Sequence, residues 1–533
     1  MRPQGRGETD SLYFTYPQFD PPAQRGGAAP VAIVGAGPVG MTAALGLARA
    51  GVRCVLFDAK ATFNDGSRAI CVSRSSFHIL ERLGAVAPFL EKALPWTTGR
   101  SFYRGRQILE FDMPDSGSEK FRPMYNIQQQ FIEAYLWEAV AREPLIETRW
   151  QSRVNGVQDM DGGVRLSVED PTGSYDFAAD WLLAADGARS AVRAMRGLRL
   201  KGENYEGRYV IADVQMAHDY PTIRRALFDP DCRRGGTVLV HRQPDDIWRI
   251  DYQLGEGEDA TEAVREEVVR ASVAAVLEEI GHQGPWELEW WSIYSANTLA
   301  LDDYRDGRVF FVGDSAHIVP IFGVRGLNNG LADADNIAWK LARVVRGRAP
   351  EQLLDSYSPE RRGATLDVFE NASKSARFMT PPSVGWTLMR DAALGLALDH
   401  PWAGQLANPR QMTPYTYADS PVVAADDPRF AGGPVPGAAL PETRVEGGFL
   451  SDRLGPGFTL LACDPALTVT HPDLHTVILP PDSEAARMLS AAPRTAYLVR
   501  PDGHIAARWA RAETDTIRAA LDHALGGDPD ASA

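Results

Sequence analysis

Two glycine-rich segments, far apart in the chain, carry the residue types that point most clearly to chemistry. The first reads GAGPVG over residues 35–40, and the second reads GDSAHIVP over 313–320 and continues as GVRGLN over 323–328. A short Asp186-Gly187 pair lies between them. A glycine-rich loop can bind phosphate through its backbone N–H groups. Several such loops from distant parts of one chain favour a single long cofactor, most simply FAD.

The first segment has the spacing of a dinucleotide-binding loop. Gly35 permits a tight turn, Gly37 lets a pyrophosphate approach the backbone, and Gly40 lets a helix pack closely on a strand. An apolar strand pattern precedes the loop, and Pro38 stands where the first helical residue is expected. Asp58 ends the next predicted strand, where a carboxylate can accept hydrogen bonds from ribose hydroxyls. These features together predict nucleotide binding.

The longer segments resemble single-component FAD-dependent aromatic hydroxylases, the group that includes p-hydroxybenzoate and 3-(3-hydroxyphenyl)propionate hydroxylases. The resemblance covers about residues 30–370. The segments that carry it are GAGPVG (35–40), GSRAI (66–70), ADGARSAVR (185–193) and GDSAHIVPIFGVRGLNNGLADADNIAWKLA (313–342).

The resemblance implies a role for each matching residue. Asp314 should accept a hydrogen bond from a ribityl hydroxyl, and the backbone N–H groups of Leu327 and Asn328 should face the N1/C2=O edge of the flavin. Gly323 and Gly326 should leave space over the ring for oxygen. The residues predicted to bind FAD are Gly35, Gly37, Pro38, Val39, Gly40, Asp58, Arg68, Gln128, Asp186, Gly187, Gly313, Asp314, Gly326, Leu327 and Asn328. Those predicted to lie at the reaction centre are Pro320, Gly323, Leu327 and Asn328.

Three further positions receive roles in the same way. Arg68 should lie near the pyrophosphate, where a guanidinium suits phosphate oxygens, and Gln128 should contact the cofactor. The Asp186-Gly187 pair should serve both FAD and NAD(P)H. His317 lies inside the flavin motif, so we expect it to make a structural hydrogen bond.

Substrate contacts are expected from the β-rich segment and from the residues after Pro320. The family usually has a second proline there, whereas this chain has Ile321 and Phe322, so the wall facing the substrate should differ. The candidate substrate residues are Arg242, Tyr252, Tyr294, Ile321 and Phe322. Trp286, Trp290 and Trp291 are expected to fill the core instead.

The implied activity is hydroxylation of a small phenolic or aromatic compound with NADH or NADPH and O₂. In this family the oxygen is delivered by a C4a-hydroperoxyflavin, and the ring reacts best as a phenolate. Three other oxygenations on the same scaffold remain open: Baeyer–Villiger insertion, epoxidation and oxidative decarboxylation. A flavin- or nucleotide-binding protein without turnover is a further alternative.

Composition limits the partners. The chain has 533 residues, a net charge of −15 and a pI of about 5.2, which argues against nucleic-acid binding. Cys54, Cys71, Cys232 and Cys463 are scattered without a CxxC pair, so neither a metal site nor a redox dithiol is predicted. There is no signal-peptide pattern and no membrane-length apolar run, so we expect a cytoplasmic protein. A homodimer is possible.

The expected fold class is α/β: a Rossmann-like FAD-binding domain with an inserted β-rich substrate domain, followed by a small thioredoxin-like α/β domain. The last assignment depends on the resemblance of AYLVRPDGHIAARW (496–509) to the redox-inactive tail of part of the family. The expected divisions are an N-terminal arm (1–28), the first part of the FAD-binding domain (29–204), the substrate domain (205–298), the second part of the FAD-binding domain (299–375), a linker or interface segment (376–439) and the thioredoxin-like domain without a CxxC pair (440–533).

Overall fold

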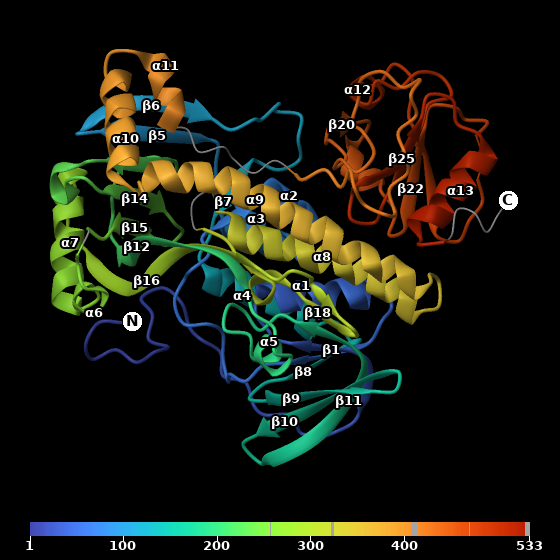
Figure 1. The fold of residues 1–533 in the computed structure, drawn as a ribbon, viewed down its shortest axis with the longest axis horizontal. Helices are drawn as coiled ribbons and strands as arrows, with labels where there is room; N and C mark the ends of the chain where they lie inside the picture. The colour runs from blue at the N-terminus through green and yellow to red at the C-terminus, as the bar shows by residue number, and fades with distance from the viewer. Residues whose placement is uncertain (256, 321–323, 408–413, 468, 528–533) are drawn as a thin grey trace.

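The computed structural model describes residues 1–255, 257–320, 324–407, 414–467 and 469–527. Two eight-stranded sheets, a group of long helices and a smaller C-terminal unit make up the molecule (Figure 1).

The first sheet is the expected nucleotide-binding sheet. Its central order is β17-β18-β11-β1-β2-β8, with β10 and β9 added through β11. Neighbours from β18 to β8 run parallel, and β10 and β9 pair antiparallel. Its strands are β1 (Ala28–Val34), β2 (Cys54–Phe57), β8 (Ile146–Arg149), β9 (Arg153–Met160), β10 (Gly163–Asp170), β11 (Gly173–Ala184), β17 (Arg305–Asp306) and β18 (Val309–Phe311).

Helices α1 (Pro38–Arg49), α4 (Gln129–Ala141) and α8 (Arg325–Val345) accompany this sheet. Pro38 occupies the first turn of α1, as predicted. Helix α8 begins at Arg325, directly after Val324. A Cβ at Gly46 would lie 2.7 Å from the Cβ of Ala338, so α1 and α8 pack with almost no side chain between them.

The second sheet is the expected β-rich insertion, with the order β19-β16-β12-β15-β14-β13-β5-β6. Two of its strands come from residues 98–112, outside the predicted segment 205–298, and β5 joins the sheet by pairing parallel with β13. Two helices, α6 and α7, lie between β15 and β16 in the chain. The elements are β5 (Thr98–Tyr103), β6 (Arg106–Asp112), β12 (Lys201–Gln215), β13 (Arg224–Phe228), β14 (Thr237–Arg242), β15 (Ile247–Gln253), α6 (Ala260–Ala263), α7 (Glu266–Glu279), β16 (Glu287–Ala300) and β19 (His317–Ile318).

A three-stranded sheet and several short helices connect the two large sheets. They are β3 (Cys71–Ser73), α2 (Arg74–Arg82), α3 (Ala87–Lys92), β4 (Leu94–Trp96), β7 (Met124–Asn126), α5 (Ala191–Met195) and the short 3-10 helix η2 (Gly313–Ser315).

The segment 376–439 differs from the predicted linker, because much of its first half is helical. Helix α9 (Tyr357–Met379) is followed by α10 (Val384–Ala397) and α11 (Pro401–Gly404). Pro381 and Pro382 lie between α9 and α10, so they separate two helices. Helix α9 runs from the C-terminal unit to the second sheet (Figure 1).

The C-terminal unit has a four-stranded sheet in the order β23-β22-β24-β25. The Pro501-Asp502-Gly503 turn joins β24 to β25. The thioredoxin-like assignment remains a prediction. The elements are β20 (Arg444–Val445), β21 (Gly448–Phe449), β22 (Phe458–Ala462), β23 (Leu474–Ile478), α12 (Glu484–Met488), β24 (Ala496–Val499), β25 (Ile505–Trp509) and α13 (Thr514–Ala524).

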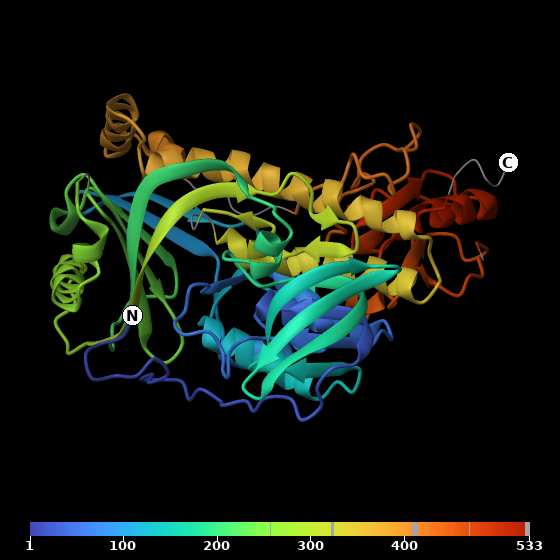
Figure 2. The ribbon, with the colours of Figure 1, turned by 60° about the horizontal axis from the view of Figure 1, so that its bottom comes forward.

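The N-terminal arm follows the surface from the second sheet to the first (Figure 2). The backbones of Met1 and Trp291 exchange hydrogen bonds, and buried Arg2 pairs with Glu289 at 2.7 Å. Further along, Phe19 stacks on Trp150 with 4.2 Å between ring centroids. The arm therefore packs against both sheets.

Candidate functional site

Three predicted motifs meet at one edge of the first sheet. Strands β1, β11 and β18 are parallel neighbours, with Val34 beside Ala184 and Ala184 beside Phe311. The loops that follow these strands contain residues 35–40, 185–187 and 313–314. The carboxyl ends of parallel strands form the usual ligand-binding edge of such a sheet.

These loops can lie in contact because glycines, which have no side chain, stand where they meet. Gly35 has φ +107°, and a Cβ there would overlap the carbonyl of Ala185. A Cβ at Gly40 would overlap the carbonyl of Gly35. A Cβ at Gly313 would lie 3.1 Å from Val39 Cγ2, so the loop after β18 packs on the loop after β1. The glycine spacing read from the sequence is therefore a packing requirement as well as a ligand signature.

Gly37 differs because nothing fills the space beside it. A Cβ there would meet only Asn64 Nδ2, at 4.0 Å. Helix α1 has no side-chain cap and no acidic residue in its first turn. Its terminal N–H groups are therefore available to an anion. Helix α8 also lacks a side-chain cap, and its N-cap residue, Val324, adopts a left-handed φ of 54°.

Two acidic residues of this edge, Asp58 and Asp186, accept hydrogen bonds from backbone donors. Asp58 accepts hydrogen bonds from the N–H of Ala36 at 2.8 Å and of Lys60 at 2.9 Å. One Asp186 oxygen accepts from Val192 N–H at 3.0 Å, and the other is buried without a partner among the described residues. Burial raises the pKa of both carboxyls. Asp58 thus orders the glycine loop, and Asp186 has a free acceptor.

Asp314 makes no hydrogen bond to the described residues, and its side chain is open to solvent. The protein nevertheless surrounds it closely enough to raise the pKa of its carboxyl, while the charges of His317 and Arg68 act in the opposite direction. Arg68 therefore lies in the electrostatic reach of Asp314. The exposed Arg68 and Asp314 side chains have the character of ligand-binding groups.

Other predicted cofactor residues make protein contacts. Gln128 donates to Pro244 O at 2.8 Å, and its buried Oε1 has no partner in the described part of the chain. Asn328 Oδ1 accepts from Ser73 N–H at 2.8 Å, so its side chain fixes β3. Of the reaction-centre residues, Pro320 is buried and Leu327 packs on the core of the first sheet. Ile321, Phe322 and Gly323 lie outside the described residues.

The two faces of the second sheet separate the substrate candidates. We call the face toward the glycine loops the inner face and the face covered by α7 the outer face. Tyr252 is buried in the apolar cluster that includes α7 residues, and Arg242 lies over the ring of Trp248 in that cluster. Both candidates therefore lie on the outer face. Tyr294 lies on the inner face and donates its hydroxyl to Val319 O at 2.7 Å.

A buried ion pair on the inner face was not anticipated from the sequence. Arg249 pairs with Asp213 at 2.8 Å and donates to the carbonyls of Ser67 and Arg68. A Cβ at Gly66 would overlap the ring of Trp290. The second sheet thus fixes the loop that presents Arg68.

Three further polar residues share this inner face. Cα pairing places His241 beside Arg249, and Asp251 lies two residues after Arg249 on β15. Arg224 precedes Arg225, which pairs with Val240, so Arg224 points to the same side as His241. Arg224 is 7% exposed and makes no hydrogen bond with the described residues. Buried atoms of His241 (Nδ1) and Asp251 (Oδ1) also lack partners there.

Burial perturbs all three groups. It raises the pKa of Asp251 to about 7, lowers the pKa of His241 to about 3, and lowers the pKa of Arg224 to about 10. At neutral pH, Arg224 is therefore charged, His241 neutral and Asp251 partly protonated. Buried polar groups normally have partners, so this set is suited to a polar ligand. The sequence did contain a signal for this polar face. Arg249 and Asp251 are charged residues two positions apart in an otherwise apolar strand, so they point to the same side of it.

The polar set formed by Arg224, His241 and Asp251 lies near the start of α8. Burial raises the pKa of the Cys71 thiol, and the charges of Arg249, Arg224 and Asp251 also act on it. Cys71 belongs to an apolar cluster against which Val324 packs. The polar set is thus close to the helix terminus at which the flavin ring is expected.

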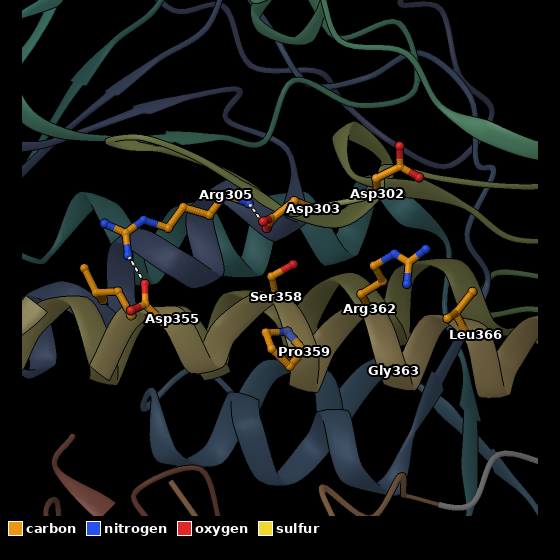
Figure 3. Close-up of a pocket in the computed structure, with 10 residues that line it drawn as sticks. Asp302, Asp303, Arg305, Asp355, Ser358, Pro359, Arg362, Gly363 and Leu366 are labelled. Atoms are coloured by element: carbon orange, nitrogen blue, oxygen red, sulfur yellow. Dashed lines mark hydrogen bonds and ion pairs between the residues drawn. The ribbon is translucent and has the colours of Figure 1, made fainter. Parts of the chain in front are cut away.

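A separate pocket of about 440 Å³ lies between α9 and the loop before β18. Figure 3 shows Arg305 reaching Asp355 on one side of the pocket, and Arg362 on the other side, farther along α9. The Asp302 and Asp355 side chains are about two-thirds exposed. None of the predicted cofactor residues lines this pocket.

Among the described residues, no group of His, Cys, Asp and Glu side chains could hold a metal ion. In the same part of the chain, no helix combines the length and apolarity needed to cross a membrane.

Comparisons with known proteins identify the family. The family described as FAD binding domain matches residues 28–372. Two curated relatives are both named 3-(3-hydroxy-phenyl)propionate/3-hydroxycinnamic acid hydroxylase. The protein from Mycolicibacterium smegmatis is 27% identical over 82% of this chain and 77% of its own length. The protein from Klebsiella pneumoniae is 29% identical over 70% of this chain and 66% of its own length.

A solved structure shows the same fold over nearly the whole chain. The flavin-dependent monooxygenase PieE, in complex with FAD and substrate, superposes with a TM-score of 0.78 at 23% identity, over 94% of this chain and 99% of PieE. The chain belongs to the family that shares this FAD binding domain, and it is an FAD-dependent monooxygenase.

Proposed function

We propose that the protein hydroxylates a small phenolic compound, using NADH or NADPH and O₂. The observation that carries this proposal is the buried, unpartnered set of Arg224, His241 and Asp251 on the inner face, beside the start of α8. The names of the two curated relatives support a phenolic substrate that also bears a carboxylate.

The sheet edge fits FAD. The open space at Gly37 and the uncapped α1 terminus suit the pyrophosphate, and the free Asp314 carboxylate suits a ribityl hydroxyl. The partnerless oxygens of Asp186 and Gln128 are further acceptors for the cofactor. FAD, when bound, supplies the redox chemistry that accepts electrons from NAD(P)H and activates O₂.

The inner-face residues would prepare the substrate. An unperturbed phenol has a pKa of about 10, yet the ring is most reactive as a phenolate. Asp251, with a pKa of about 7, can accept the phenol proton near neutral pH. The charged Arg224 would then stabilise an anionic oxygen, either the phenolate or a carboxylate of the same molecule. Neutral His241 can donate or accept one hydrogen bond.

The fixed loop at Ser67 and Arg68 would help exclude water. Arg249 joins this loop to the second sheet, so the sheet and the cofactor edge are connected on one side of the site. Exclusion of water matters because activated oxygen is otherwise lost without transfer to substrate.

The proposal is tested with a panel of phenols, with and without a carboxylate, including 3-(3-hydroxyphenyl)propionate. Each compound is scored for stimulated NAD(P)H oxidation and for a product heavier by one oxygen. A hydroxylated ring supports the proposal. Products of ring insertion, epoxidation or decarboxylation contradict hydroxylation, and flavin binding without turnover of any phenol contradicts the activity.

Adjacent arginines provide a matched pair for the substrate site. Arg224 lies on the inner face, whereas Arg225 lies on the outer face against the rings of Tyr220 and Phe102. Arg224→Met should raise KM for the best phenol at least about tenfold, since a charge-assisted hydrogen bond is lost. Arg225→Met should leave KM within about twofold. Equal effects of the two variants would remove Arg224 from the site.

We also infer a homodimer formed through α10 and α11. These helices and the short 3-10 helix η4 (Gln405–Ala407) after them expose large apolar side chains, at Val384 (77%), Leu388 (67%), Trp402 (64%) and Leu406 (59%). An exposed apolar patch of this kind favours burial against a second copy. Trp402→Glu should convert a dimer to a monomer in light scattering. A wild-type monomer would contradict the inference.

A cytoplasmic location completes the proposal. All four cysteines are unpaired, as expected in a reducing compartment. Fractionation of the host cell should recover activity with cytoplasmic markers, and recovery outside the cytoplasm would contradict it.

A further inference from the structure

A buried ion network joins the C-terminal unit to the first sheet's helices. Glu360 on α9 forms an ion pair with Lys340 on α8 at 2.7 Å. It forms a second one at 2.6 Å with Arg500, in the turn that follows β24. Arg500 also pairs with Asp502 at 2.5 Å. All four side chains are at most 3% exposed. Two cations and two anions therefore balance within one closed interface.

The hydrogen bonding of this network is extensive. Glu360 also accepts from Ser420 and from Asn336, and Asp502 accepts from Trp339 Nε1 at 3.1 Å. Burial alone would raise the pKa of Glu360, but the charges of Arg500 and Lys340 hold it well below its ordinary value. Removing one member of a buried network leaves the others uncompensated, so this interface has one well-defined arrangement.

Arg361, the residue after Glu360 on α9, contacts residues that lead toward the edge of the first sheet where the cofactor is expected. Arg361 donates to Asp333 Oδ1 at 2.6 Å and to Asn329 O at 3.1 Å. It also donates to the hydroxyl of Tyr417 at 2.9 Å. The Tyr417 ring packs on His504, with 4.3 Å between centroids, so Tyr417 belongs to the C-terminal interface.

Asp333 then fixes the loop after β18. Its Oδ2 accepts from Gly313 N–H at 3.0 Å and lies 2.6 Å from His317 Nε2. Both groups flank Asp314. A continuous series of buried contacts thus extends from His504 through Tyr417, Arg361 and Asp333 to the Gly313-Asp314 loop.

We propose that Tyr417 and the turn at 500–504 are positioning residues of the FAD site, through which the C-terminal unit orients the Gly313-Asp314 loop. This inference rests on the proposed contact of Asp314 with FAD. By linkage, a unit that favours the binding-competent loop must itself be stabilised when FAD binds. The C-terminal unit would then be an integral part of the cofactor site.

The test compares two buried tyrosines. Tyr417→Phe removes one hydrogen bond to Arg361, whereas Tyr497→Phe removes one to Leu489 O inside the C-terminal unit. We expect Tyr417→Phe to raise the FAD dissociation constant about fivefold or more, and Tyr497→Phe to leave it unchanged. Hydrogen exchange adds an independent readout. In wild type, FAD should slow exchange of the Arg500 and Gly503 amides, and Tyr417→Phe should reduce this protection.

Two results would overturn the proposal. One is a folded Tyr417→Phe variant that binds FAD as tightly as wild type. The other is exchange at residues 500–504 that does not respond to FAD in wild type. If the underlying contact is wrong instead, Asp314→Ala will retain full FAD affinity, which separates that failure from failure of the coupling.

Discussion

The cofactor edge and the inner face of the second sheet recognise their ligands by different means. At the edge, glycines and helix termini present backbone atoms, and Gly35, Gly40 and Gly313 bring three loops into contact. On the inner face, single side chains such as Arg224 and Asp251 provide the polar groups. Backbone recognition requires a fixed glycine spacing, which a sequence displays. Side-chain recognition requires only one polar residue on each of several strands.

The largest effect on FAD binding should come from a substitution at the glycine-rich edge of the first sheet. Gly37→Val should abolish FAD binding, because the side chain fills the space left for phosphate. The protein should still fold, since Gly37 has a negative φ of −76° and a Cβ there would meet only Asn64 Nδ2, at 4.0 Å. Visible absorbance and far-UV circular dichroism measure the two properties. A yellow Gly37→Val protein with full FAD content would contradict the assignment.

The second effect concerns the inner face. Asp251→Asn should lower kcat/KM for a phenol about a hundredfold at pH 8, because the proton acceptor is lost. In wild type, kcat/KM should rise as pH increases through about 7, where Asp251 ionises. The variant should lack this rise. A pH profile unchanged by Asp251→Asn would assign the ionisation to another group.

Asp314→Ala tests the side-chain contribution at the edge. Loss of one hydrogen bond to a charged acceptor should raise the FAD dissociation constant about tenfold to a hundredfold. Fluorescence titration of apoprotein measures it. Because Asp314 makes no hydrogen bond to the described residues, thermal stability without FAD should change little. Loss of stability without loss of affinity would indicate a structural role.

The smallest effect is expected at Tyr294. Its hydroxyl donates to Val319 O, which precedes Pro320 at the reaction centre. Tyr294→Phe should lower stability by about 1 kcal/mol and should alter kcat less than Asp251→Asn does. Denaturant unfolding and steady-state kinetics measure both quantities. A loss of kcat as large as that of Asp251→Asn would give Tyr294 a direct role.

The edge could be predicted from the sequence for a physical reason. Strand, glycine loop and Pro38-led helix are local, so β1 and α1 appear where the pattern places them. Strand β11 pairs with β1 on one side and with β18 on the other, and this brings the distant motifs together. The FAD contacts of individual residues remain predictions, although the loops that contain them converge.

The inner face could not be predicted in the same way. The face of the sheet to which a strand residue points depends on the strand's register with neighbouring strands that are far away in sequence. A register shift of one residue moves every side chain of the strand to the opposite face. Arg242 and Tyr252 were therefore reasonable candidates that lie on the outer face. Strands β5 and β6 were missed because β5 pairs with β13, more than one hundred residues away, and β6 joins the sheet through β5. The network at Glu360 likewise joins three distant segments.

The most direct test of the account is a crystal structure of the protein with FAD and a turned-over phenol. The account predicts FAD phosphates at Gly37 and the α1 terminus, and a phenol oxygen within hydrogen-bond distance of Arg224 or Asp251. A phenol bound instead on the outer face near Tyr252, or in the pocket between Arg305 and Arg362, would contradict it.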